Sequence, residues 1–114
     1  MNLSKLHVYQ RSQSLVTEVL VLTGELPRGW GFLADQIRRA ATSVPLNLAE
    51  GCGRPERGDR RRAFDMALGS LHELAAALDV LHRTGLLPAP RFSALWQECD
   101  AISRMLGRLR ANAA

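Results

Sequence analysis

The chain has 114 residues, enough for one compact domain and too few for two, so a single domain spanning 1–114 is expected. Hydrophobic residues make up 46% of the sequence and the mean hydropathy is −0.09, values that argue against a disordered or membrane-inserted chain. No apolar run approaches the ~18 residues that cross a bilayer, and the charged start lacks the apolar core of a signal peptide. The sequence therefore predicts a cytoplasmic protein.

The charge is the first indication of a partner. Fifteen basic residues against eleven acidic ones give a formal charge of +4, and all of the basic residues except Lys5 are arginine. Because the planar guanidinium matches phosphate geometry, one interpretation is a polyanionic partner. The other is an arginine-rich composition inherited from a GC-rich genome. Charge alone does not separate the two.

The apolar residues follow helical spacing, and no stretch alternates long enough to predict a strand. Glycine and proline separate four periodic segments, about 3–23, 31–51, 59–84 and 90–112. Helices of about 20 residues joined by short connections are typical of an antiparallel up-and-down four-helix bundle. The sequence thus predicts an all-α fold, with a longer, charged connection at 51–58.

The second segment contains Pro45 within a helical pattern. A proline inside a helix costs about 3 kcal/mol and leaves the Ala41 carbonyl without its usual donor. We expect a kink at Pro45, braced by hydrogen bonds from Ser43 and Asn47. Because Glu50 lies in the last turn, where the helix dipole disfavours an anion, it is expected to pair with a nearby arginine, Arg39 or Arg54. A direct ligand-contact role for these residues is the alternative.

The third segment carries more apolar surface than one buried stripe requires. A helix that is hydrophobic nearly all round needs burial on more than one side, so a self-association surface is predicted. The alternative is an exposed alanine face chosen for helix propensity. The residues concerned are Ala63, Met66, Ala67, Ala75, Ala76, Ala77 and Val80.

No catalytic, cofactor or metal motif is evident. His72 and Glu73 begin like the zinc-protease sequence H-E-x-x-H, but Ala76 stands where the second histidine must be. A Gly-rich phosphate loop of the Walker form is also missing. The chain is therefore not expected to be an enzyme or to bind a cofactor or metal.

The two cysteines are expected to be free thiols, as is usual in a cytoplasmic chain. Cys52 lies between two glycines with Arg54 nearby, which could lower the pKa of the thiol. Since no base is evident in the neighbourhood, a loop packing role is expected for Cys52 instead of a reactive one.

The stretch 54–62, RPERGDRRR, holds five arginines against Glu56 and Asp59. Arginines near a helix N-terminus oppose the dipole, so their clustering indicates another purpose, such as phosphate binding. The alternative is a solvated loop neutralised by its two acidic residues. No aromatic residue interleaves with these arginines, so any nucleic-acid binding should be backbone-directed and salt-sensitive. The predicted contacts are Arg38, Arg39, Arg54, Arg57, Arg60, Arg61 and Arg62.

Two sequence blocks point to a known family. They are Ser43-x-Pro45-x-Asn47-x-Ala49-Glu50-Gly51 and Gly69-Ser70-x-x-Glu73, with Gln36-Ile37-Arg38-Arg39-Ala40 before them. These motifs resemble the four-helix bundle proteins encoded in intervening sequences of bacterial large-subunit ribosomal RNA genes. The accessory variability determinant of diversity-generating retroelements is similar. The second block adds Ser70 and Glu73 to the predicted polar network.

The resemblance also implies an assembly and partners. It implies a ring-like homopentamer, and the retroelement relatives are basic pentamers that bind nucleic acid and a reverse transcriptase. We therefore expect a non-enzymatic homo-oligomer that binds nucleic acid, with RNA as the expected form and a reverse transcriptase as a further partner. The alternative is a protein–protein adaptor that recruits an acidic or polymerase-like protein.

Overall fold

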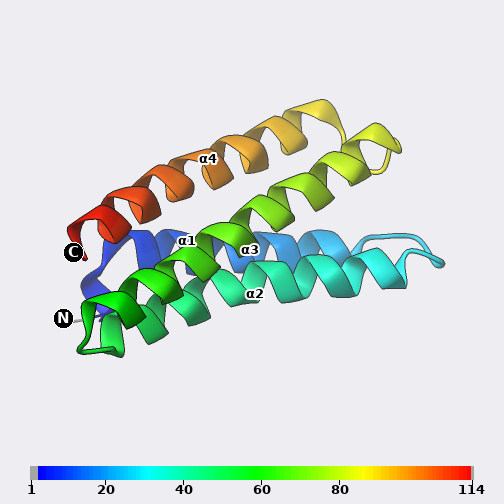
Figure 1. Ribbon diagram of the computed structural model, residues 1–114. Helices are drawn as coiled ribbons and strands as arrows, with labels where there is room; N and C mark the ends of the chain where they lie inside the picture. The colour runs from blue at the N-terminus through cyan, green and yellow to red at the C-terminus, as the bar shows by residue number, and fades with distance from the viewer. Residues whose placement is uncertain (1–2, 114) are drawn as a thin grey trace.

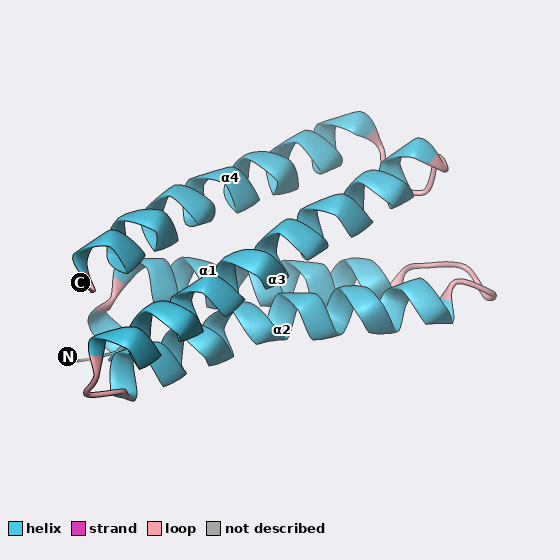
Figure 2. Ribbon diagram, in the orientation of Figure 1, coloured by secondary structure: helices cyan, strands magenta, loops and turns pink. Residues whose placement is uncertain are grey.

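The computed structural model describes residues 3–113 and confirms the predicted all-α fold (Figures 1 and 2). Within this range there is no strand. A short 3-10 helix, η1, precedes four α-helices. The bounds are η1 Leu3–Lys5, α1 His7–Gly24, α2 Gly31–Gly53, α3 Arg57–Arg83 and α4 Ala89–Asn112. No helix in the described range has a stretch long and apolar enough to cross a membrane.

The helices form an antiparallel bundle measuring 44 × 23 × 21 Å. α2 packs against α1 and α3, and α4 packs against α3 and, less extensively, α1. Both ends of the described chain and the α2–α3 connection lie at one end of the bundle, as Figure 1 shows. The other two connections lie at the opposite end. Residues far apart in sequence, such as the start of α3 and the last turns of α4, therefore come close together.

The core is built from the predicted stripes. On α2, Ile37, Val44 and Leu48 are at most 1% exposed, and α4 buries Leu95 and Ile102 to a similar extent. The buried stripe of α1 includes a polar residue: Ser12 is 1% exposed, and its hydroxyl donates to the Tyr9 carbonyl at 2.9 Å. The buried residues of α1 are Val8, Ser12, Leu15, Val16, Val19, Leu22 and Thr23.

The α2–α3 connection is shorter than the predicted 51–58. Only residues 54–56 lie outside a helix, because α2 continues to Gly53 and α3 begins at Arg57. Gly51 and Gly58 lie inside α2 and α3, and Gly53 is the last residue of α2. Tertiary packing overrides their low helix propensity, and Gly51 in particular is buried against Phe64 on α3.

α2 runs through Pro45 as one α-helix, and Pro45 is buried. The ring has no N–H to donate to the Ala41 carbonyl, so this turn lacks one backbone hydrogen bond. Two residues further along, the Asn47 side chain donates to the Ser43 carbonyl at 2.9 Å. The kink itself stays a prediction.

The alanines of α3 are largely covered within the chain. Ala63, Ala67 and Ala77 are at most 7% exposed because α3 packs between α2 and α4. Met66 and Val80 remain 55% and 44% exposed. The apolar surface left over for a second copy is therefore smaller than the sequence pattern indicates.

Candidate nucleic-acid interface

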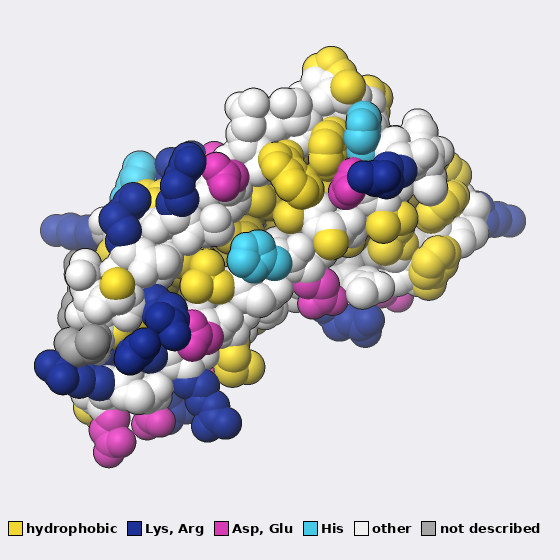
Figure 3. Space-filling view, turned by 45° about the horizontal axis from the view of Figure 1, so that its top comes forward, with side chains coloured by type: hydrophobic (Ala, Val, Ile, Leu, Met, Phe, Trp, Pro, Cys, Tyr) yellow, Lys and Arg dark blue, Asp and Glu magenta, His cyan; other side chains and the backbone are white. Residues whose placement is uncertain are grey.

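Charge is distributed unevenly along the bundle. When each helix is divided at its midpoint, the half with both chain ends (residues 3–15, 43–70 and 101–113) holds ten basic and four acidic side chains, a formal +6. The other half holds five basic and seven acidic side chains, a formal −2. Figure 3 shows lysine and arginine side chains gathered on the half of the bundle that holds both chain ends. We call this half the basic end.

The structure does not bring all seven predicted arginines into one site. Arg38 and Arg39 lie on the other half of α2, and Arg39 is about 22 Å along the helix from Arg54 at a rise of about 1.5 Å per residue. Arg38 donates to the Thr23 hydroxyl at 3.0 Å and pairs with Asp35 at 3.3 Å. These two arginines therefore belong to a different part of the surface from the other five.

Arg54 is partly neutralised. Its guanidinium pairs with Glu50 one turn earlier at 2.8 Å, and this hydrogen bond raises the pKa of Arg54. The predicted partner of Glu50 is thus Arg54 and not Arg39. Both side chains are about half exposed, so the pair contributes little to stability.

Arg60 serves the fold. Its two terminal amino groups donate to the carbonyls of Arg54 at 3.2 Å, Pro55 at 2.5 Å and Ala113 at 3.3 Å. These bonds tie the α2–α3 connection to the end of α4. Because three of its five N–H donors bind backbone carbonyls, we leave Arg60 out of the proposed contact surface and regard it as a positioning residue.

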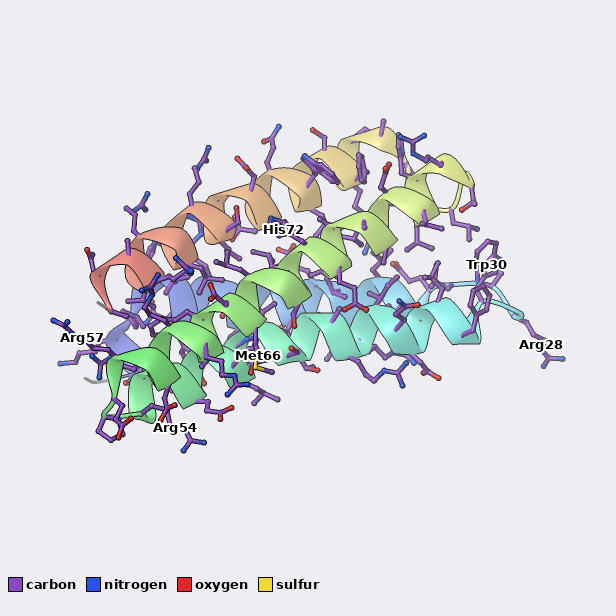
Figure 4. All side chains as sticks on the ribbon, in the orientation of Figure 1. Arg28, Trp30, Arg54, Arg57, Met66 and His72 are labelled. Atoms are coloured by element: carbon purple, nitrogen blue, oxygen red, sulfur yellow. The ribbon has the colours of Figure 1, made fainter. Side chains whose placement is uncertain are left out.

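Arg57, Arg61 and Arg62 are exposed on the first turns of α3. Among residues 3–113, none of the three lies within 4.0 Å of a carboxylate. In Figure 4 the Arg57 side chain projects outward into solvent from this end of the bundle. An anion can approach these side chains without breaking an existing ion pair.

Sequence reasoning missed the contribution of α4. Arg104, Arg108 and Arg110 lie in its last turns, beside the start of α3. Arg104 pairs with Asp100 at 2.9 Å, and Arg110 pairs with Asp65 of α3 through its Nε. The available signal was the antiparallel order itself, which places the end of the fourth helix next to the beginning of the third.

The predicted polar network divides into separate parts. The Ser43 and Ser70 hydroxyls lie 2.5 Å apart and link α2 to α3, and Asn47 donates to the Ser43 hydroxyl at 3.0 Å. Glu73 accepts a hydrogen bond from Gln36 at 3.3 Å, also between α2 and α3. The Glu50–Arg54 pair and the Pro45 ring are outside these contacts.

Both cysteines are free thiols. Cys52 lies in α2, not in a loop as predicted, and burial raises the pKa of its thiol instead of Arg54 lowering it. Burial, followed by the nearby charge of Glu98, raises the pKa of Cys99 to about 12. Within residues 3–113 no group of three potential metal ligands comes together.

The comparisons with known proteins agree with this architecture. The chain is similar to a crystal structure of a protein of unknown function from the S23 ribosomal protein family of Bacteroides thetaiotaomicron, at 21% identity and a TM-score of 0.84. The similarity covers 90% of this chain and 97% of that one, and it shows the fold alone. No curated protein matches. The model of the family described as 23S rRNA-intervening sequence protein matches residues 4–108, almost the entire bundle, so the chain belongs to that family.

Proposed function

We propose that this protein is a non-enzymatic, cytoplasmic, self-associating bundle that binds nucleic acid, with RNA as the expected form, through phosphate contacts at the basic end. The observation that carries the proposal is a group of exposed arginines, Arg57, Arg61 and Arg62, that have no carboxylate partner among residues 3–113. They lie within six residues at the start of α3, where the formal charge is most positive.

The contacts expected from such a surface are mainly to the backbone of the nucleic acid. Guanidinium groups neutralise phosphates and release counterions, so affinity should fall steeply as salt is raised. The aromatic residues of the chain are few, 5% of the sequence, which disfavours base stacking as the main source of affinity. Sequence preference should accordingly be weak.

The test compares two variants of equal charge. In the first, Arg57, Arg61 and Arg62 are replaced by glutamine. In the second, Arg28, Arg83 and Arg91 of the opposite end are replaced. Binding of a short single-stranded RNA, a hairpin RNA and a DNA of the same sequence is followed by fluorescence anisotropy during a salt titration.

The first variant should bind RNA more weakly. The slope of the logarithm of its binding constant against the logarithm of salt concentration should be about 2 less steep, since each lost phosphate contact in a single strand lowers this slope by about 0.7. The second should bind like the parent. Equal binding by the parent and the first variant across the titration would rule out this surface.

Self-association is supported by the large apolar side chains that the bundle leaves exposed. These are Leu20, Val21, Phe32, Leu46, Met66, Val80 and Trp96, with exposed fractions from 43% to 70%. Trp96 borders a groove of about 360 Å³ between α3 and α4, which Ala76 also lines. A second copy that covers this groove would remove the indole from water. The family resemblance favours five copies, with a combined formal charge of +20 from +4 each.

Light scattering coupled to size exclusion measures the mass directly. Ala76→Glu should reduce the mass to that of a monomer, whereas Ala111→Glu, an equal change at an exposed position of α4, should not. If assembly concentrates charge for binding, Ala76→Glu should also bind RNA more weakly. A parent that is monomeric at micromolar concentration would contradict self-association.

A protein–protein adaptor is the second candidate, and the exposed aromatic pair of the opposite end favours it. The rings of Trp30 and Phe32 stack at 5.9 Å, Phe32 is 70% exposed, and Trp30 and Arg28 lie at the end away from the basic arginines (Figure 4). As an adaptor, the protein would bind an acidic or polymerase-like partner such as a reverse transcriptase. Phe32→Ser should then weaken that protein complex and leave RNA affinity unchanged.

A further inference from the structure

Three arginines from two helices converge on one hollow at the basic end. Arg61 and Arg62 come from the start of α3, and Arg110 comes from the end of α4. The hollow has a volume of about 470 Å³. We call it the α3–α4 hollow, and its lining is Gly58, Arg61, Arg62, Asp65, Met66 and Arg110. Three positive charges and one negative charge leave a formal +2 around it.

Asp65 holds one of these arginines in place. Its carboxylate accepts the hydrogen bond of Arg110 Nε, which uses one edge of the guanidinium. No described residue hydrogen-bonds the two terminal amino groups of Arg110. A guanidinium already fixed in orientation loses less conformational freedom when it binds a phosphate oxygen.

The shape of the hollow favours a strand over an enclosed small molecule. It is wide open to solvent, so a strand can lie across it without being enclosed. Met66 is 55% exposed beside the arginines and offers an apolar contact to a sugar or base. Gly58 has no atom within 4 Å of its side-chain position, so nothing closes the hollow there.

We infer that the α3–α4 hollow binds one phosphodiester group of a nucleic-acid strand, which Arg110 of α4 contacts together with Arg61 and Arg62 of α3. The inference rests on the proposed function and deepens it. It assigns a role to α4, and it directs the strand across the α3–α4 junction instead of along α3 alone.

The experiment uses two arginines on the same helix. Arg110→Gln removes a lining residue of the hollow. Arg108→Gln removes the same charge two residues away, from an exposed arginine that borders a different depression with Leu6 and Leu109. RNA affinity at physiological salt should fall about tenfold in Arg110→Gln, the effect of one charge-assisted contact, and less than about twofold in Arg108→Gln.

A double variant separates position from net charge. Asp65→Asn with Arg110→Gln leaves the formal charge of the chain at +4. If only overall charge matters, this variant binds RNA like the parent. If the hollow binds a phosphate, the double variant should bind RNA about as weakly as Arg110→Gln, and the slope of its salt dependence should correspond to about one phosphate contact fewer. Circular dichroism melts of all variants verify that they remain folded.

The other outcomes are equally informative. Equal losses in Arg110→Gln and Arg108→Gln would overturn the hollow and leave binding by the basic end intact. RNA affinity that none of the arginine variants changes would overturn both proposals. A 5′-mononucleotide that displaces RNA as effectively as a trinucleotide would show a nucleotide site and would overturn the strand path.

Discussion

Gly51 of α2 lies directly against the ring of Phe64 on α3. A Cβ atom at Gly51 would be 2.4 Å from Cε1 and 2.8 Å from Cδ1 of that ring. Phe64 is itself only 2% exposed, so the ring has no open space into which it can move. The two helices approach closely here because one of them carries no side chain. This contact explains physically why the S-x-P-x-N-x-A-E-G block ends in glycine.

Gly51→Ala should therefore destabilise the protein. Alanine favours a helix by about 1 kcal/mol over glycine, but overpacking a filled core costs about 1–3 kcal/mol. We expect a net loss of up to about 2 kcal/mol in the free energy of unfolding, measured by urea denaturation. The control is Gly69→Ala on the exposed face of α3, where the added methyl meets nothing within 4 Å. That variant should gain about 0.5–1 kcal/mol. Two variants of equal stability would contradict the contact.

The hydroxyl pair between α2 and α3 leads to a second prediction. Asn47→Leu removes the donor to the carbonyl and the hydroxyl of Ser43, and it should cost about 1–2 kcal/mol in thermal or urea unfolding. Glu50→Leu removes only the exposed pair with Arg54 and should change stability by less than about 1 kcal/mol. If the two substitutions cost the same, the bracing is not centred on Ser43.

Arg60 is predicted to matter for order at the basic end. Arg60→Gln should weaken the attachment of the α2–α3 connection to the end of α4 and cost about 1–2 kcal/mol, because it removes donors to three carbonyls. Hydrogen exchange should accelerate in the last turn of α4. Arg61→Gln, one position further along α3, should change the free energy of unfolding by less than about 0.5 kcal/mol and leave hydrogen exchange in the last turn of α4 unchanged. Unchanged exchange in Arg60→Gln would refute the positioning role.

Stability should fall in alkali because of Cys99. The pKa of its thiol is about 12 in the folded state against an ordinary 9.0, so between these values the unfolded chain has lost a proton that the folded one keeps. Unfolding then becomes easier as pH rises through 9, by about 1.4 kcal/mol per pH unit at most, and the effect fades within about one pH unit below 9.

The difference between the parent and Cys99→Ala in urea unfolding at pH 8 and pH 10 isolates this contribution, since all other groups titrate in both. Between pH 8 and pH 10 the free energy of unfolding should fall less in Cys99→Ala than in the parent. A thiol reagent at pH 8 should also label the half-buried Cys52 well before Cys99. Rapid labelling of both thiols in the folded protein would be inconsistent with the burial of Cys99.

Local spacing was enough to predict the helices and most of the core. The residues at positions 37, 40, 41, 44 and 48 are all buried, as their periodicity indicates. What local spacing did not predict is where α2 ends. Gly51 favours termination by propensity, yet α2 continues two residues further to Gly53, and Gly51 packs against Phe64, thirteen residues on.

The candidate surface was harder to predict for a related reason. The run 54–62 identified the start of α3 as basic, but it did not show that Arg60 turns to backbone carbonyls while its neighbours stay exposed. It also gave no sign of Arg110, 48 residues further along, which reaches the same hollow through the antiparallel packing of α3 and α4. Both facts depend on tertiary contacts that no local pattern encodes.

The unequal charge of the two halves makes the protein an electric dipole as well as a cation. With a formal +6 at one end of a 44 Å rod and −2 at the other, its field differs strongly from that of a uniformly charged particle. In the field of a polyanion the molecule experiences a torque before it makes any contact, and it turns its basic end forward. The first encounter is thereby biased towards the productive orientation, and raising the ionic strength slows association by weakening that alignment.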